Sequence, residues 1–230
     1  MEVLRRFWST DRSLTALLLL LAALIFVVDP LGDLGVGGHV LLDVVFSLLL
    51  ISGVGAVARG VLPTVVVGGL VFASLALRWL RLSSGADWLA APDVLLSALL
   101  CAILAAIVLV QVFRAGPITA QRLQGAVAVY LLFGLAWAFT YTFIALRWPD
   151  AFALSAAAVN PNSDLASRFV YFSFVTLTTT GYGDITAVHP VARSLVMAEA
   201  LVGQLYPAIL LARLVSMEVY YRQGQRMERE

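Results

Sequence analysis

The sequence predicts an all-α integral membrane protein with six transmembrane helices, and composition is the first reason. Of the 230 residues, 61% are hydrophobic and 13% are charged, and the mean hydropathy is +0.95. A water-soluble globule could not bury this much apolar surface. The charged residues also fall between long apolar runs instead of alternating with them, as expected of a chain that crosses a lipid bilayer several times.

Six apolar runs are long enough to cross a hydrocarbon core about 30 Å thick. They cover residues 14–28, 39–58, 62–80, 93–113, 123–146 and 191–217. The first run comes after Arg5 and Arg6, and a basic start followed by an apolar run is also typical of a signal peptide. It ends at Asp29 and Pro30 without the small residues of a cleavage site, so we interpret it as a retained helix.

Arginine predicts the orientation of the chain, because cytoplasmic loops carry an excess of basic residues. With a cytoplasmic N-terminus, ten arginines lie inside and five outside. Both termini are therefore expected in the cytoplasm, on a multi-pass protein of the cell membrane, plasma or inner. The net charge of +1 and the absence of lysine argue against a nucleic-acid-binding protein.

The connection between the fifth and sixth runs, residues 148–187, is too long for a turn, and we expect the functional site there. Residues 160–164, Asn-Pro-Asn-Ser-Asp, provide N-cap chemistry for a short helix that ends at about Thr178. That helix would run directly into a segment whose glycines, Gly181 and Gly183, allow unusual backbone angles. Non-helical backbone at membrane depth must be buried or line a water-filled cavity, so we expect a re-entrant helix and loop.

Residues 172–184, Phe-Ser-Phe-Val-Thr-Leu-Thr-Thr-Thr-Gly-Tyr-Gly-Asp, resemble the pore helix and selectivity filter of tetrameric potassium channels. The resemblance extends through Arg193 and Gly203 and covers residues 123–222. In that family, four filter loops provide carbonyl oxygens that replace the hydration shell of the ion. The resemblance implies a homotetramer in a lipid bilayer, with one pore helix and one filter loop from each chain.

The resemblance also implies a role for each filter residue. The predicted filter consists of Thr179, Thr180, Gly181, Tyr182 and Gly183. The carbonyls of the first four, with the Thr179 hydroxyl, would coordinate K+, and Gly183 and Asp184 would shape the outer mouth. Consecutive carbonyls can face one axis only if alternate residues adopt left-handed angles. The sequence departs from the family at Thr180, where a hydroxyl replaces the usual valine or isoleucine.

Four residues are predicted to support the filter: Thr176, Thr178, Asp184 and Glu199. Glu199 lies inside the sixth apolar run, where an ionisable residue needs a partner. We expect a structural hydrogen bond to Thr176, Ser173 or Arg193, with direct ion contact as the alternative.

Gly203 and Pro207 lie one turn apart in the sixth run, and proline disrupts the helix at the residue four positions earlier. We interpret this pair as a gating hinge, with a static bend as the alternative. Gln204 follows Gly203 and could face the pore cavity.

The sequence divides into three regions: an N-terminal four-helix domain at 1–117, a pore domain at 118–222 and a short cytoplasmic tail at 223–230. A voltage sensor needs several arginines along its fourth helix, and residues 93–113 contain none. We interpret Arg78 and Arg81 as anchors whose charged ends reach the membrane surface. The role of the first four helices and the gating stimulus are left open.

The predicted function is passive K+ conduction without strong voltage gating. The sequence contains no catalytic triad, nucleotide loop or metal-ligand spacing, so we expect no enzyme activity and no cofactor, with K+ as the permeant ion. The expected partners are the bilayer and three further copies of the chain, with no nucleic acid and no soluble ligand identified. A nonselective cation channel and a non-conducting scaffold or regulatory subunit remain alternatives.

Overall fold

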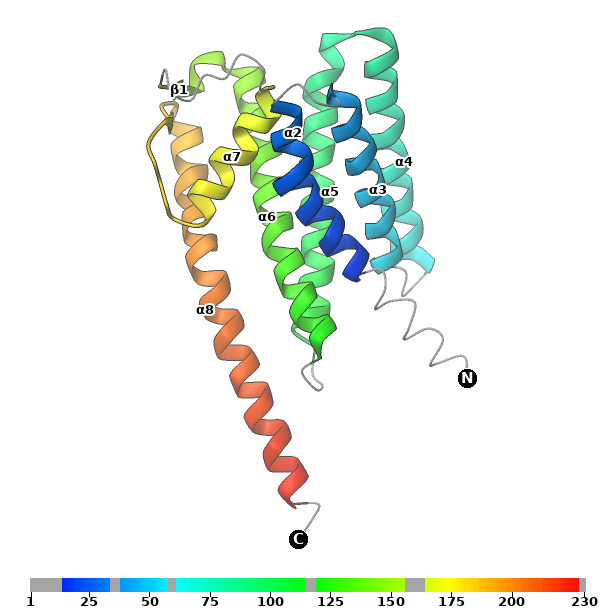
Figure 1. Cartoon of the computed structure of the whole chain (residues 1–230), viewed down its shortest axis with the longest axis vertical. Helices are drawn as coiled ribbons and strands as arrows, with labels where there is room; N and C mark the ends of the chain where they lie inside the picture. Colours follow the sequence, from blue (N-terminus) through cyan, green and yellow to red (C-terminus); the bar gives the residue numbers. More distant parts are fainter. Residues whose placement is uncertain (1–13, 34–37, 58–60, 115–118, 156–163, 228–230) are drawn as a thin grey trace.

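The computed structural model describes residues 14–33, 38–57, 61–114, 119–155 and 164–227. This part of the chain is mostly helical, as the sequence predicts. Figure 1 shows the helices packed side by side, with the C-terminal half of α8 (Pro190–Met227) extending beyond the others.

The N-terminal half consists of consecutive apolar helices. The first begins at Leu14, continues through the π-helical stretch η1 (Leu24–Val28) and ends with α2 (Asp29–Asp33). The following helices are α3 (Gly38–Val57), α4 (Val61–Ser84), the short 3-10 helix η2 (Asp87–Leu89) and α5 (Ala90–Val112).

Five helices in the described residues are long and apolar enough to cross a membrane. They are Leu14–Leu31, Thr64–Ser84, Ala90–Val112, Ala120–Arg147 and Pro190–Met217. The predicted run 39–58 coincides with α3. The apolar stretch found there among the described residues, Leu41–Gly53, is too short to cross a membrane. The structure therefore supports a multi-pass helical protein, while the count of six spans stays a prediction.

The predicted regions share one hydrophobic core. It joins the first four helices to α6 (Ala120–Arg147), and its fully buried residues include Leu17, Leu49, Leu104 and Leu132. The predicted boundary between residues 117 and 118 lies outside the described residues. The predicted tail begins inside α8, which continues as helix to Met227.

A buried ion-pair cluster joins α3, α4 and α5. Arg78 is 6% exposed, and its guanidinium lies 2.9 Å from Asp43 and 3.5 Å from Asp93, while donating a hydrogen bond to Ser97. Arg81 lies 3.5 Å from the other Asp93 oxygen. The prediction that Arg78 reaches the membrane surface is wrong, because carboxylates on both neighbouring helices hold its charge inside the bundle.

Among the residues that the structure describes, a small β-ribbon is the one departure from an all-α fold. After the 3-10 helix η3 (Pro149–Ala151), β1 (Phe152–Leu154) pairs antiparallel with β2 (Ile185–Ala187), with Ala153 opposite Thr186. The ribbon ties the chain before the pore region to the chain after the predicted filter. Three-residue strands are too short to produce a sequence pattern, so the sequence analysis missed them.

The predicted short helix is confirmed as α7 (Leu165–Leu177), capped by Asp164, whose carboxylate accepts a 2.7 Å hydrogen bond from the Ser167 backbone N–H. Figure 1 shows α7 descending at a slant beside α6 and α8 from the end of the bundle where it begins. The chain then returns to that same end as an extended segment, which is the path expected of a re-entrant loop.

An aromatic cluster packs beneath the ribbon. Tyr141 of α6 contacts the Phe152 ring at 5.7 Å and the Phe172 ring at 5.3 Å, and the Phe152 and Phe169 rings are 4.6 Å apart. These rings join α6, α7 and β1 into a second core. Large aromatic surfaces of this kind stabilise the region that holds the predicted filter.

Candidate functional site

The predicted filter segment, residues 178–184, has an alternating backbone. The φ angles of Thr179, Gly181 and Gly183 are +58°, +57° and +78°. Thr179 is the one non-glycine residue with positive φ in the described part of the chain, and a β-branched residue rarely adopts this conformation. The sequence-based expectation that alternate residues take left-handed angles is therefore confirmed.

The C-terminal end of α7 holds the start of the segment. The backbone N–H groups of Thr180 and Gly181 both donate to the Val175 carbonyl, at 2.9 and 3.3 Å, and Thr179 donates to the Thr176 carbonyl at 2.8 Å. Carbonyls at the end of a helix carry partial negative charge. A cation beside the segment would therefore be stabilised by the end of α7 as well as by the segment's own carbonyls.

The hydroxyl of Thr180, the residue that departs from the family pattern, has a partner. Thr178 donates its hydroxyl to the Phe174 carbonyl at 2.7 Å, and the Thr178 and Thr180 hydroxyl oxygens are 2.9 Å apart. Because the single Thr178 proton is directed at Phe174, Thr180 is the donor in the second bond. Thr180 is thereby tied to α7 by its side chain as well as by its backbone.

Gln204 connects α8 to the N-terminal end of the segment. Its side-chain amide donates to the Thr179 hydroxyl oxygen at 3.3 Å. The direction of the Gln204 side chain could not be predicted from the sequence. The contact places an amide beside the hydroxyl that the family resemblance assigns to ion coordination.

Asp184 lies at the C-terminal end of the segment. Its carboxylate accepts from the Tyr171 hydroxyl at 2.7 Å and from the Ile185 backbone N–H at 3.0 Å. Its backbone carbonyl accepts from Ser155 at 2.8 Å, next to the β1–β2 ribbon. The side chain thus ties the segment to α7 through Tyr171, and its role in supporting a filter stays a prediction.

Glu199 is fully buried where α6, α7 and α8 meet. Its carboxyl oxygens lie 2.6 Å from the Tyr141 hydroxyl and 2.5 Å from the Ser173 hydroxyl, which in turn lies 2.7 Å from the Gly134 carbonyl. Of the three partners expected from the sequence, the structure selects Ser173. Arg193 instead donates to the Ala187 carbonyl, and the Thr176 carbonyl accepts from Thr179.

At Gly203, α8 lies very close to the backbone of α7. A Cβ added at this position would clash with the Leu177 carbonyl oxygen and would lie 2.7 Å from the Leu177 carbonyl carbon. The same carbonyl oxygen accepts a hydrogen bond from the Tyr130 hydroxyl of α6 at 3.2 Å. Glycine at 203 is therefore required by close packing, independently of any hinge at Pro207.

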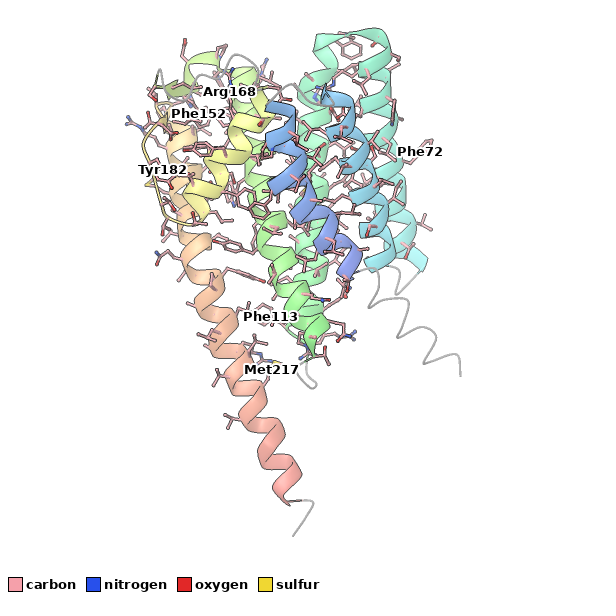
Figure 2. The ribbon with its side chains drawn as sticks, viewed as in Figure 1. Phe72, Phe113, Phe152, Arg168, Tyr182 and Met217 are labelled. Atoms are coloured by element: carbon pink, nitrogen blue, oxygen red, sulfur yellow. The ribbon has the colours of Figure 1, made fainter. Side chains whose placement is uncertain are left out.

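Of the predicted site residues, Glu199 and Gly203 lie at this junction of α6, α7 and α8, and Thr179 contacts α8 through Gln204. Tyr182 points outward: Figure 2 shows it at the edge of the bundle on the side of α8, and its side chain is 70% exposed in the single chain. Sequence reasoning missed Tyr141, which lies 58 positions before Glu199 and gives no local signal.

Residues 128–219 match the family model described as "Ion channel". This match confirms the expectation of an ion channel family and covers the whole junction described above.

One curated relative is Protein LctB of Bacillus caldotenax, 34% identical over 87 residues, which are 37% of this chain. The chain spans 64% of the length of that relative. No solved structure matches the chain at a significant level.

Proposed function

We propose that the chain is one subunit of a potassium-selective channel that conducts K+ passively through a homotetrameric pore. The observation that carries the proposal is the alternation of left-handed angles at Thr179, Gly181 and Gly183 directly after the C-terminal end of α7. Such alternation turns successive carbonyls toward one side, where they can replace the hydration shell of K+. The ligands would be the carbonyls of residues 179–182 and the Thr179 hydroxyl.

A tetramer is proposed because one chain provides one loop and a filter of this kind needs four. The exposed side chains of the single chain agree with this assembly. Tyr182 and a series of large apolar residues on α8, among them Leu201, Leu205 and Ile209, are exposed. An exposed apolar surface next to the predicted filter segment is expected where further copies of the chain pack.

The proposed topology has six spans, both termini in the cytoplasm and residues 178–184 toward the outer side. Opening would depend only weakly on membrane potential, since α5 contains no arginine to move through the field. A measured gating charge of several elementary units would contradict this part of the proposal.

The alternatives are a nonselective cation channel and a non-conducting scaffold or regulatory subunit. A flux assay on the purified protein in liposomes distinguishes them from a K+-selective channel. A K+-selective channel lets K+ but not Na+ cross the liposome membrane. A nonselective channel lets both ions cross, and a scaffold lets neither cross. The aromatic residue between the two filter glycines, Tyr182, favours the selective channel.

Replacing Gly181 by alanine is expected to abolish conduction. An L-residue in a left-handed conformation costs roughly 1–2 kcal/mol, and the tetramer would contain the change four times. Gly85→Ala is the matched control, since Gly85 has a φ of +62° and open space around it but lies after α4, away from the segment. Normal K+ flux in Gly181→Ala, or equal loss in both variants, would refute the filter assignment.

The gating hinge remains a proposal, and Pro207 is the position at which to test it. Pro207 lies within the continuous helix α8, and its backbone cannot donate the usual helical hydrogen bond. Gly203→Ala is unsuitable as a hinge test because its Cβ would clash with Leu177. Pro207→Ala should change the open probability in single-channel recordings, and an unchanged open probability would identify a static bend.

A further inference from the structure

Glu199 carries an ionisable group into the interior of the helical bundle. It lies on α8 within the candidate span Pro190–Met217, and its side chain is fully buried. Its carboxyl group contacts the Tyr141 hydroxyl of α6 and the Ser173 hydroxyl of α7. The protonation state of the carboxyl group follows from which of these oxygens has a proton to donate.

The Ser173 hydroxyl oxygen has two short contacts and one proton. It lies 2.5 Å from the Glu199 Oε1 atom and 2.7 Å from the Gly134 carbonyl oxygen. Both distances are those of hydrogen bonds between oxygens, so each needs a proton between its two atoms. A carbonyl can only accept, so the Ser173 proton belongs to the bond with Gly134. The proton of the other bond therefore comes from Glu199.

The contact with Tyr141 agrees with this assignment. The Tyr141 hydroxyl donates to the Glu199 Oε2 atom at 2.6 Å, and a carboxylic acid protonated at Oε1 keeps Oε2 as an acceptor. An ionised Glu199 would instead take the Ser173 proton. The Ser173 oxygen would then face the Gly134 carbonyl oxygen at 2.7 Å with no proton between them. The neutral acid accounts for all three contacts.

The groups around Glu199 provide no positive charge to balance a carboxylate. From α6, the titratable side chains near it are Tyr141 and Tyr130, and Tyr130 directs its hydroxyl to the end of α7. From α7 the contact is the Ser173 hydroxyl, and on α8 Arg193 donates to a backbone carbonyl of β2. In the described part of the chain, no arginine or histidine forms an ion pair with Glu199. A buried charge without such a partner is costly, and the group is instead held neutral.

We propose that the junction of α6, α7 and α8 is a proton-binding site, in which Glu199 is a neutral carboxylic acid at neutral pH. Release of the proton turns the Ser173 hydroxyl from the Gly134 carbonyl toward Glu199, so that this bond between α7 and α6 is lost. Occupancy of the site thus controls how α7, the helix before the predicted filter segment, is held on α6. The proposal does not depend on conduction.

Infrared spectroscopy tests the protonation state directly. The full chain is placed in lipid nanodiscs with its glutamates isotopically labelled at the side-chain carboxyl group, and the carbonyl stretch of a neutral acid is separate from the bands of a carboxylate. An ordinary glutamate is ionised at about pH 7, so a labelled neutral-acid band is expected from Glu199 alone. Glu199→Gln should remove this band. Glu218→Gln, which removes another glutamate of α8, is the matched control and should retain it.

The dependence of stability on pH gives a second, independent measurement. The folded protein holds a proton that the unfolded chain releases, so the stability of the parent falls as pH rises. From about pH 5 to about pH 7, the melting temperature of the parent should fall relative to that of Glu199→Gln by roughly 3–5 °C for each pH unit. Glu218→Gln should follow the parent.

Three results would each overturn the proposal. They are the absence of a neutral-acid band that depends on Glu199, equal pH dependence of the parent and Glu199→Gln, and a Glu199→Gln protein that does not fold. The third counts because the amide has the same donor and acceptor pattern as the neutral acid toward Ser173 and Tyr141. Neither readout uses ion flux, so failure of the proposed channel function would leave both results unchanged.

Discussion

Gly203→Ala should yield a protein that does not fold stably. The added Cβ meets the backbone carbonyl of Leu177, and a helix backbone cannot move aside as the end of a flexible side chain can. Overpacking in a core costs roughly 1–3 kcal/mol, and we expect this clash to reach or exceed the upper end of that range. Movement of α8 would also disturb the Gln204 contact with Thr179, one residue further along the helix.

Gly68→Ala is the matched control for this change. Gly68 also lies inside a membrane helix, α4, but a Cβ there has nothing within 4 Å. Alanine should be neutral or stabilising by up to about 1 kcal/mol, because it has the higher helix propensity. The test compares the yield of folded protein and the melting temperature of the two variants. A Gly203→Ala protein as stable as the parent would mean that α7 and α8 are not packed as closely as described.

Loss of the Glu199 side chain should have an effect of similar size. Glu199→Ala removes the partner of the Tyr141 hydroxyl and leaves a cavity at the junction of α6, α7 and α8. An unsatisfied buried polar group costs about 1–3 kcal/mol, and the lost packing adds to it. We expect a clear drop in melting temperature, together with loss of K+ flux, because α7 is held by the same network through Ser173.

Glu199→Gln should be much better tolerated. Its amide offers an oxygen to the Tyr141 hydroxyl and an N–H to the Ser173 oxygen, whose own proton can then be donated to the Gly134 carbonyl. Ser194→Ala, an exposed change on α8, controls for substitution in that helix. A cycle of Tyr141→Phe and Glu199→Ala, in which each change removes the hydrogen bond between the two side chains, should show a coupling of about 0.5–3 kcal/mol. Additive effects would mean that the two side chains do not interact.

The sequence was sufficient to predict the local backbone of the filter segment. Gly181 and Gly183 alternate with larger residues over a few positions, and such angles are a local property of the chain. The same holds for α7, since Asp164 marks its start and the segment after Thr178 marks its end. Local signals of this kind do not require knowledge of neighbouring helices.

Features that depend on contacts between distant helices were predicted less well. Arg78 lies near a helix end, where an anchor at the membrane surface is the usual interpretation, but the carboxylates of α3 and α5 surround it. Gly203 was interpreted as part of a hinge because it is a glycine one turn before Pro207. Its close contact with the Leu177 backbone depends on how α7 crosses α8. The sequence alone does not show which neighbouring helices the Arg78 face of α4 and the Gly203 face of α8 contact.

The central claim is that the segment at 178–184 selects potassium, and the reversal potential under bi-ionic conditions tests it most directly. The purified protein is placed in a planar bilayer with K+ on one side and Na+ on the other. We predict a reversal potential near the K+ limit, with Na+ current too small to resolve, because carbonyls held by alternating backbone angles replace the hydration shell of K+. A reversal potential near zero, with clear currents of both ions, would contradict the account.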